Sequence, residues 1–205
     1  VHKLGVITAL RSWRADLKIY DFRVETDGQI VPLPEMQTIY KSGSATTNTY
    51  RIPALLVSKK GTILAFAEAR RNSGSDTANI DTVVRRSEDG GKTWGDEIIV
   101  FDERDNVAGN PCPVVDQSTG RIWSLQTWNS HQVPENQTKA GFGEDSRRVF
   151  ITYSDDDGKT WAKAKDITRS AKQKHWSWYA TGPGAGIQLQ RGKHKGRLII
   201  PCDHK

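Results

Sequence analysis

The stretch "SEDGGKTW" (residues 87–94) recurs as "SDDDGKTW" (residues 154–161), and this repeat decides the fold. In each copy the Asp carboxylate can accept backbone N–H groups and close a tight turn, while the following Gly supplies the positive φ that such a turn needs. The Trp then buries a large ring against neighbouring strands. Because the turn already occupies the carboxylate, we expect both Asp residues to be structural and not catalytic. The shared positions are Ser87, Asp89, Gly91, Thr93 and Trp94, and Ser154, Asp156, Gly158, Thr160 and Trp161.

Short β-type runs surround both copies of the turn. These runs are rich in β-branched and apolar residues, and no stretch of helical length shows a 3.6-residue period. The breaks between them carry Gly, Asp, Ser and Lys, as hairpins require. The sequence therefore predicts an all-β chain. The expected strands are 51–57, 62–69, 81–87 and 97–101; then 113–116, 121–128, 148–154 and 163–167; then 182–190 and 197–202.

The three sets of strands follow one another as a repeat. Each set opens near a proline, namely Pro53, Pro113 and Pro183. Four strands within about 65 residues are typical of propeller blades, and propellers close with about four to eight of them. An open array would leave an unpaired sheet edge at each end. We therefore expect this chain to hold roughly the first two and a half blades of a longer propeller.

Residues 1–35 differ from the repeats. "ADLKIYDFRVETDG" (15–28) alternates as a strand does, and "GQIVPLPE" (28–35) is typical of a linker. Two interpretations stay open: the end of a preceding β-sandwich, or an N-terminal strand of the propeller itself. The predicted domains are thus 1–35 and 36–205.

Composition argues against membrane and nucleic-acid proteins. The chain has 205 residues, of which 36% are hydrophobic and 26% charged, and no apolar run approaches the roughly 20 residues of a membrane span. Part of the net charge of +6 lies in "RGKHKGR" (191–197), which is typical of a solvated hairpin tip, and no nucleic-acid-binding motif accompanies it. The five His show no metal-ligand spacing. Cys112 and Cys202 lack metal or redox spacing, so we expect both to be reduced and buried.

Other motifs accompany the repeated turn in a fixed order. The turn, S-x-D-x-G-x-T-W, resembles the Asp-box, and together these segments resemble the sialidase (neuraminidase) family over residues 36–205. The resemblance implies a six-bladed β-propeller and a retaining exo-α-sialidase, which hydrolyses terminal sialic acids from glycoproteins, glycolipids or oligosaccharides. At Ala185 relatives often have His, so the substrate contact made there is not carried over. The accompanying segments are "YRIP" (50–53), "GTILAFAEAR" (61–70), "GNPCPVVD" (109–116), "TWN" (127–129) and "WYATGPGAGIQL" (178–189).

Arg51 is the first candidate for substrate binding. Sialic acid carries a carboxylate, and the planar guanidinium of Arg, which never deprotonates, binds carboxylates through two hydrogen bonds. Arg51 begins the innermost strand of a blade, beside Pro53, where side chains reach the central axis. The resemblance makes it one of three arginines for the substrate carboxylate, with the other two in later blades.

Asp76 is the candidate for acid–base catalysis. It lies in the Gly/Ser-rich loop "RRNSGSDTANID", and loops on a rigid scaffold often carry catalytic groups. The resemblance makes it the residue that protonates the leaving oxygen and then activates water. We expect this loop to be mobile and to close over the substrate. Asp81, the rival carboxylate, begins a strand, and we expect it to pair with Arg85 or Arg86.

The nucleophile of the family is a tyrosine. A carboxylate attacking a carbon that already bears one would be repelled, whereas a neutral phenol activated by a Glu avoids this repulsion. The resemblance places both residues in later blades, so neither Tyr153 nor Tyr179 is assigned to the role. We therefore expect residues 1–205 alone to be inactive.

Weaker candidates complete the predicted site. By resemblance, Arg70 lies on the ring-hydroxyl side of the sugar, and Asn110 faces the ring hydroxyls. Trp128 either forms a wall for the N-acetyl group or belongs to the core, and Asp203 and His204 are candidates for the rim. We expect the other Trp residues to serve packing or the rim. Those residues are Trp13, Trp123, Trp176 and Trp178.

Two other functions share the same first half. One is a trans-sialidase, and the other is a sialic-acid-binding propeller without catalysis. A downstream Tyr with its Glu distinguishes an enzyme from a lectin. No cofactor is expected, a structural calcium stays open, and resemblance implies a secreted, periplasmic or cell-surface protein.

Overall fold

The computed structural model describes residues 24–26, 29–31 and 37–205. The chain divides into two compact units, Val1–Thr38 and Ile39–Lys205. Much of the segment 1–35 lies outside the described residues, so its identity stays a prediction.

The described part of the first unit is a β-hairpin. Strand β1 (Val24–Thr26) pairs antiparallel with strand β2 (Gln29–Val31). Strand β2 lies in the segment 28–35, so the prediction of a linker is wrong there. The rest of the alternating stretch that begins at residue 15 lies outside the described residues.

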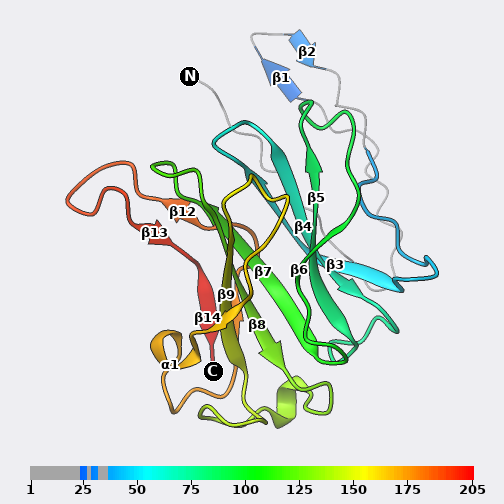
Figure 1. Cartoon of the computed structure of the whole chain (residues 1–205), viewed down its shortest axis with the longest axis vertical. Coiled ribbons are helices and arrows are strands. Elements are labelled where there is room, and N and C mark those ends of the chain that lie inside the picture. The colour runs from blue at the N-terminus through cyan, green and yellow to red at the C-terminus, as the bar shows by residue number, and fades with distance from the viewer. Residues whose placement is uncertain (1–23, 27–28, 32–36) are drawn as a thin grey trace. The chain divides into compact units, whose positions relative to one another are not determined.

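The first blade is an antiparallel sheet in chain order, and it matches the first predicted set of strands. Strand β4 is the most buried of its four strands, since only its first residue is not buried. Figure 1 shows the four strands side by side. The strands are β3 (Thr49–Val57), β4 (Ile63–Arg70), β5 (Ile80–Ser87) and β6 (Ile98–Phe101).

The second blade repeats this arrangement. A parallel pair between Ile80 and Val107 joins it to the first blade. Its innermost strand begins at Val107 and not at residue 113 as predicted. The strands are β7 (Val107–Val115), β8 (Ile122–Asn129), β9 (Arg148–Ser154) and β10 (Lys165–Asp166).

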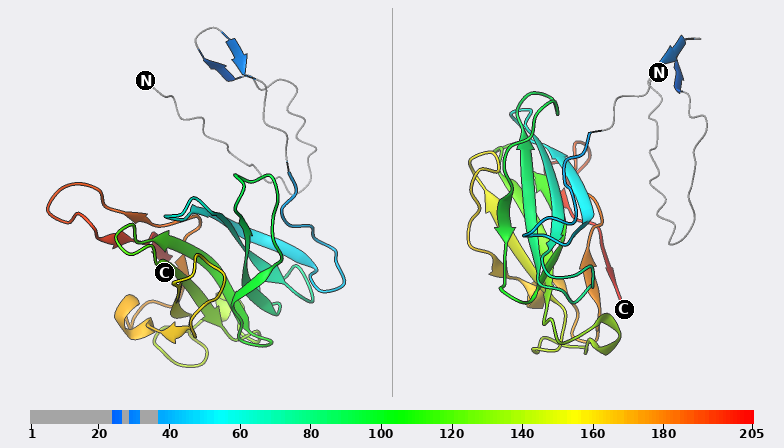
Figure 2. Two further views of the ribbon diagram at one scale, coloured as in Figure 1. Left: turned by 45° about the horizontal axis from the view of Figure 1, so that its top comes forward. Right: turned by 90° about the vertical axis from the view of Figure 1, so that its right-hand side faces the viewer.

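A third set of strands follows as two short antiparallel ladders beside the second blade (Figure 2). Its members are β11 (Tyr179–Thr181), β12 (Ile187–Gln188), β13 (Leu198–Ile199) and β14 (Cys202–His204). The helical turns are short: η1 (Glu135–Gln137) and α1 (Thr168–Ala171). The all-β prediction is therefore confirmed, and the described strands follow one another as consecutive propeller blades.

The same backbone irregularity recurs in each innermost strand or, in the third set, directly after it. Ile52, Asn110 and Gly182 have φ of 51°, 54° and 78°, and each is followed directly by a proline. The proline of the second blade that corresponds to the other two is therefore Pro111. The predicted choice of Pro113 is wrong.

A β-bulge accompanies this irregularity in the first two blades. The register shifts between Arg51 and Ala54 on β3, and between Gly109 and Cys112 on β7. A bulge breaks the regular alternation of side chains and changes the direction of those beside it. Gly109 and Asn110 are residue types that usually interrupt strands. For this reason the first half of β7 could not be predicted from the sequence.

Both repeated turns hold their own carboxylate. Asp89 accepts hydrogen bonds from the backbone N–H of Lys92 (3.0 Å) and Thr93 (2.9 Å) and from the Thr93 hydroxyl (2.6 Å). Asp156 accepts the corresponding bonds from the N–H and hydroxyl of Thr160 at 2.9 and 2.6 Å. The Thr93 hydrogen bonds are the main reason that the pKa of Asp89 is lowered.

The second turn also attaches its blade to the first, through a contact that we call the blade latch. Asp157 accepts hydrogen bonds through its carboxylate from the Thr62 hydroxyl (2.5 Å) and the Arg86 guanidinium (3.3 Å). Its backbone carbonyl accepts Arg86 Nε–H at 2.8 Å. Next to it, Gly158 lies against Leu64 with no room for a Cβ atom.

The hydrophobic core lies between these two blades. Leu64 and Phe66 of β4 pack with Val115 and Ile122 of the second blade. The Trp161 ring of the second turn meets Phe66 edge-on, with ring centroids 5.7 Å apart. The repeated turn thus contributes its aromatic ring across the blade boundary.

Candidate active site

Arg51, Arg70 and Asp76 converge at one end of the first blade. The Asp76 Oδ1 atom lies 3.0 Å from an Arg51 nitrogen and 2.7 Å from an Arg70 nitrogen. Arg51 precedes the irregularity in β3, Arg70 ends β4, and Asp76 lies in the following loop. The Asp76 side chain is 77% exposed and that of Arg51 is 30% exposed, whereas Arg70 is buried. Two guanidinium groups and one accessible carboxylate therefore lie in direct contact at this end of the blade.

The buried carboxylate of Glu68 fixes the position of the Arg70 guanidinium. One oxygen of this buried carboxylate accepts Nε–H and Nη2–H of Arg70 at 3.1 and 2.8 Å. The other oxygen accepts the backbone N–H of Asn110 at 2.9 Å. Gly109 lies so close to the carboxylate that a Cβ atom there would clash. Glu68 therefore connects the arginine of the first blade to the innermost strand of the second.

The base of the loop is held by an ion-pair network. Arg71 pairs with Asp81 at 2.6 Å and with Glu97 at 3.0 Å. The predicted pairing of Asp81 with Arg85 or Arg86 is wrong, because the loop folds back and brings Arg71 to it. Burial raises the pKa of Asp81 to about 6, although the Arg71 hydrogen bond opposes the change.

Two cavities lie beside this group. The smaller has a volume of about 150 Å³ and is lined in part by Arg70 and Asp76. The larger, of about 430 Å³, is lined by residues of the second blade and the third set of strands and by Ile52 of the first blade. Because the two share lining residues, we treat them as one candidate pocket. The shared residues are Ile52, Asn110, Glu135 and Trp178.

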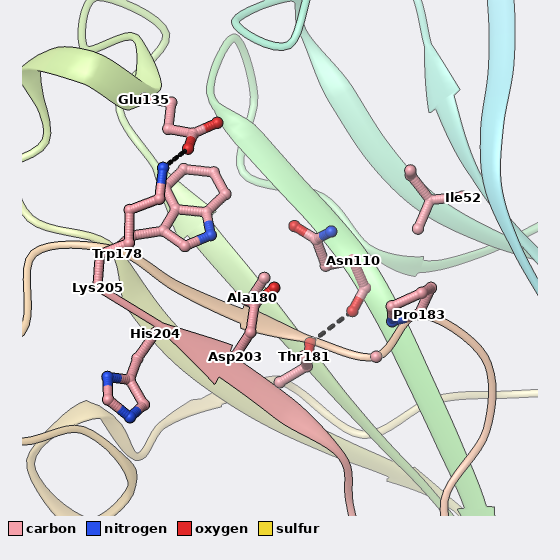
Figure 3. A pocket seen from close by; sticks show the side chains of 11 residues that line it. Ile52, Asn110, Glu135, Trp178, Ala180, Thr181, Pro183, Asp203, His204 and Lys205 are labelled. Carbon is pink, nitrogen blue, oxygen red and sulfur yellow. Dashed lines mark hydrogen bonds and ion pairs between the residues drawn. The ribbon is translucent and has the colours of Figure 1, made fainter.

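Figure 3 shows the walls of the larger cavity. Trp178 forms one wall, and Glu135 pairs with Lys205 beside it. Asn110 extends from β7 toward the middle of the view, and Thr181 donates its hydroxyl hydrogen to the Asn110 carbonyl at 2.5 Å. The wall residues thus come from the second blade and the third set of strands, together with Ile52 of the first blade.

Arg147 is a buried cation where these walls meet, and it is only 4% exposed. It donates to the side-chain oxygens of Asn110 and Asn129 and, through Nε, to the Tyr179 carbonyl at 3.2 Å. Its guanidinium lies 4.3 Å from the centre of the Trp178 ring. Burial lowers the pKa of Arg147 to about 10, so the group is positively charged at neutral pH.

A second buried cation holds the backbone of the first. Lys172 is 3% exposed, and its Nζ donates to the carbonyls of Gly141 (3.1 Å), Arg147 (3.1 Å) and Ser177 (3.0 Å). Burial, helped by the Arg147 charge, lowers the pKa of Lys172 to about 8. Three chain segments therefore meet at one ammonium group.

The structure brings most predicted contact residues together. Arg70, Asp76 and Asn110 line the candidate pocket, and Arg51 reaches it through Asp76. Trp128 lines neither cavity.

The two rim candidates also lie at the pocket. Asp203 and His204 line the larger cavity. The His204 ring stacks on Trp176, with ring centroids 3.7 Å apart. His204 lies on β14, the last described strand.

Sequence reasoning missed Glu68, Glu135 and Arg147, and it expected Trp178 to serve packing or the rim. A signal was available for Glu68, because a carboxylate inside the apolar run "ILAFAEAR" needs a buried partner. Arg147 lies in "EDSRRVF", where nothing distinguishes it from a surface arginine. Its partners come from distant strands, so only the fold identifies it.

Other predicted features can be placed as well. Within residues 24–26, 29–31 and 37–205, no cluster of three or more His, Cys, Asp or Glu side chains could bind a metal ion. The helices in the same ranges are too short or too polar to span a bilayer.

Cys112 is free and buried, but Cys202 is free and exposed, so its predicted burial is wrong. Among the described strands, β14 pairs with β11 alone.

Comparisons with known proteins identify the family of this chain. Residues 61–205 match the family described as BNR repeat-like domain. Sialidase-3 of Rattus norvegicus is 35% identical over 80% of this chain and 40% of the relative. An exo-alpha-sialidase of Aspergillus fumigatus is 33% identical over 76% of this chain and 41% of the relative. The chain thus spans about two fifths of the length of these relatives.

Solved structures of sialidases and trans-sialidases have a similar fold. Hadza microbial sialidase Hz136 has a TM-score of 0.76 and 28% identity, and the match covers 86% of this chain and 37% of that one. A leech intramolecular trans-sialidase has a TM-score of 0.77 over 84% of this chain and 43% of its own, at 16% identity, which shows a shared fold.

Proposed function

Because the chain belongs to the sialidase family with a BNR repeat-like domain, we propose that it carries part of the active site of an exo-α-sialidase. The observation that carries this proposal is the meeting of Arg51 and Asp76, whose charged groups lie 3.0 Å apart beside the candidate pocket. The reaction is the hydrolysis of terminal sialic acids from glycoproteins, glycolipids or oligosaccharides, with retention. By the same resemblance we propose a secreted, periplasmic or cell-surface location.

Arg51 binds the substrate carboxylate. Its planar cation is part-exposed, and it can donate two parallel hydrogen bonds to a carboxylate. Asp76 now accepts a hydrogen bond from the same guanidinium. Two carboxylates at one site repel each other, so the substrate carboxylate displaces Asp76 from Arg51. Binding therefore releases the Asp76 side chain from Arg51 and leaves it available to the leaving oxygen of the substrate.

Asp76 then acts as the acid and base. Its exposed side chain lies on a Gly/Ser-rich loop that can move. Once it has left Arg51, Asp76 takes a proton from water, and as the glycosidic bond breaks it gives this proton to the leaving oxygen. It later takes a proton from the attacking water. By resemblance a tyrosine from a later blade forms the covalent intermediate, so turnover requires the rest of the propeller.

Kinetics of the full-length protein test this assignment with two sialosides, one with an alcohol leaving group and one with an acidic phenol. Asp76→Asn should lower kcat/KM for the alcohol by about 10²–10⁴-fold, because that leaving group needs a proton. The loss should be much smaller for the phenol, which leaves without one. Arg51→Lys should raise KM for both by about tenfold or more.

Glu88→Gln is the matched control, because it removes an exposed carboxylate in the repeated turn, and we expect unchanged kinetics. Equal losses for both leaving groups with Asp76→Asn would show that Asp76 does not act as the acid. Unchanged kinetics in both site variants would overturn the whole assignment.

The two alternative functions give different products in the same experiment. A hydrolase releases free sialic acid, whereas a trans-sialidase transfers it to an acceptor or forms an anhydro sugar. A sialic-acid-binding propeller binds without releasing product. Analysis of the products by NMR therefore separates all three.

A further inference from the structure

We propose that Arg147 is the positioning residue of the candidate pocket: it sets the spacing between Asn110 and Trp178 and thereby the affinity for the anionic sugar. This inference rests on the proposed function, and it concerns a residue outside every motif described above. Arg147 lies directly before β9. It contributes to the smaller cavity itself.

The first argument is the geometry of the guanidinium fork. Its three nitrogens donate to three different strands, at Asn110 on β7, Asn129 at the end of β8 and the Tyr179 carbonyl on β11. A planar guanidinium holds its donors in fixed directions. The second blade and the third set of strands therefore keep one fixed separation at the pocket.

The second argument is the contact with the Trp178 wall. The guanidinium lies 4.3 Å from the ring centre, and this attraction is stronger where water is excluded. Trp178 lines both cavities. One group therefore holds Asn110 through a hydrogen bond and Trp178 through its ring.

The third argument is the support from Lys172. Its ammonium donates to the carbonyl of Arg147 and to that of Ser177, the residue before Trp178. The two partners of the ring contact are thus attached to the same nitrogen. Lys172 lines neither cavity, so it can act on the pocket only through them.

The fourth argument is charge. Within the described residues, no carboxylate lies at ion-pair distance from Arg147 or Lys172, and the acceptors of both cations are neutral oxygens. Burying two unpaired cations is unfavourable. The attraction of Glu68, Glu135, Asp76 and Asp203 offsets only part of this cost for Arg147, so the fold keeps a cation at the pocket although its burial is unfavourable.

The test uses the full-length protein, its KM and kcat on a fluorogenic sialoside, and its Kd for free sialic acid by calorimetry. Arg147→Lys keeps the charge but cannot reach three acceptors at once. We expect KM and Kd to rise about tenfold or more, with kcat changed by less than about threefold. The matched control is Arg121→Lys, because Arg121 also stacks on Trp123 but lies outside the pocket. It should leave both constants unchanged.

Two further variants keep the inference testable if Arg147→Lys folds poorly. Asn129→Ala and Lys172→Met loosen Arg147 from two sides without touching the cavity lining. Both should raise KM and Kd in the same direction by a smaller factor. A lower melting temperature with unchanged Kd would show a merely structural role and overturn the inference.

The failures of the two proposals are distinguishable. If the wild-type protein binds and cleaves sialosides while Arg147→Lys behaves like Arg121→Lys, the Arg147 inference alone is wrong. If the wild-type protein neither binds nor cleaves them, the proposed function is wrong and the inference falls with it.

Discussion

Replacing Asp157 with Gly should break the blade latch while leaving the turn intact. The first repeated turn has Gly90 at the corresponding position, with φ of 76°, and Asp157 has φ of 68°. Glycine adopts such a conformation without strain. The substitution therefore removes the carboxylate contacts to Thr62 (2.5 Å) and Arg86 (3.3 Å), together with a hydrogen bond from Ser58.

The size of the effect follows from burial. Asp157 and Arg86 have side chains that are 8% and 12% exposed, so water screens their attraction weakly. Hydrogen bonds to charged groups contribute about 1.5–3 kcal/mol each, and breaking a buried pair costs about 3–5 kcal/mol. Arg86 keeps its bond to the backbone carbonyl at 2.8 Å, which reduces the loss. We expect the free energy of unfolding to fall by about 2–4 kcal/mol.

Denaturant unfolding of the full-length protein measures this loss. Glu88→Gln is the control, because it removes the other carboxylate partner of Arg86, at 2.8 Å and 65% exposed. Exposed pairs contribute at most about 1 kcal/mol. If the two substitutions cost the same, or if Asp157→Gly costs less than about 0.5 kcal/mol, the latch does not join the blades energetically.

Three further predictions concern the same region. Burial raises the pKa of Asp157, but hydrogen bonds to its carboxylate outweigh this effect and lower the pKa overall. The carboxylate therefore stabilises the folded protein fully above the unfolded-state pKa near 4. This stabilisation is lost as the pH falls through the folded-state pKa. The difference in unfolding free energy between the wild type and Asp157→Asn should accordingly shrink in acid. Gly109→Ala should displace Glu68 and lower kcat/KM on a sialoside by about tenfold or more, since misplaced site groups are costly; unchanged kinetics would contradict it. Gly158→Ala should press on Leu64 and cost about 1–3 kcal/mol of stability by denaturant unfolding, and a neutral result would show that this contact relaxes.

The strands of the first blade could be predicted because each is a run of apolar or β-branched residues between turn residues. The same reasoning failed at the start of β7, where Gly109 and Asn110 resemble breakers although the strand continues through a bulge. Local pattern cannot reveal that difference, since the partner strand that stabilises the bulge lies elsewhere in the sequence.

In the candidate site, too, some residues could be predicted from the sequence and others could not. Arg51 and Asp76 could be proposed because each stands in a recognisable segment of the chain. The role of Arg147 depends on acceptors from three strands, which no local spacing encodes. The partner of Asp81 was missed for a related reason, because the loop reverses and brings Arg71 to it.

The left-handed residue before each proline affects which amino-acid substitutions the protein can accept at that position. A β-branched side chain at Ile52 stores conformational strain of about 1–3 kcal/mol, whereas Asn110 and Gly182 accept their φ values more readily. Exchanging Ile52 for Asn would release part of that stored energy and put an amide on the cavity surface. New ligand preferences could therefore arise at this position together with a gain in thermal tolerance.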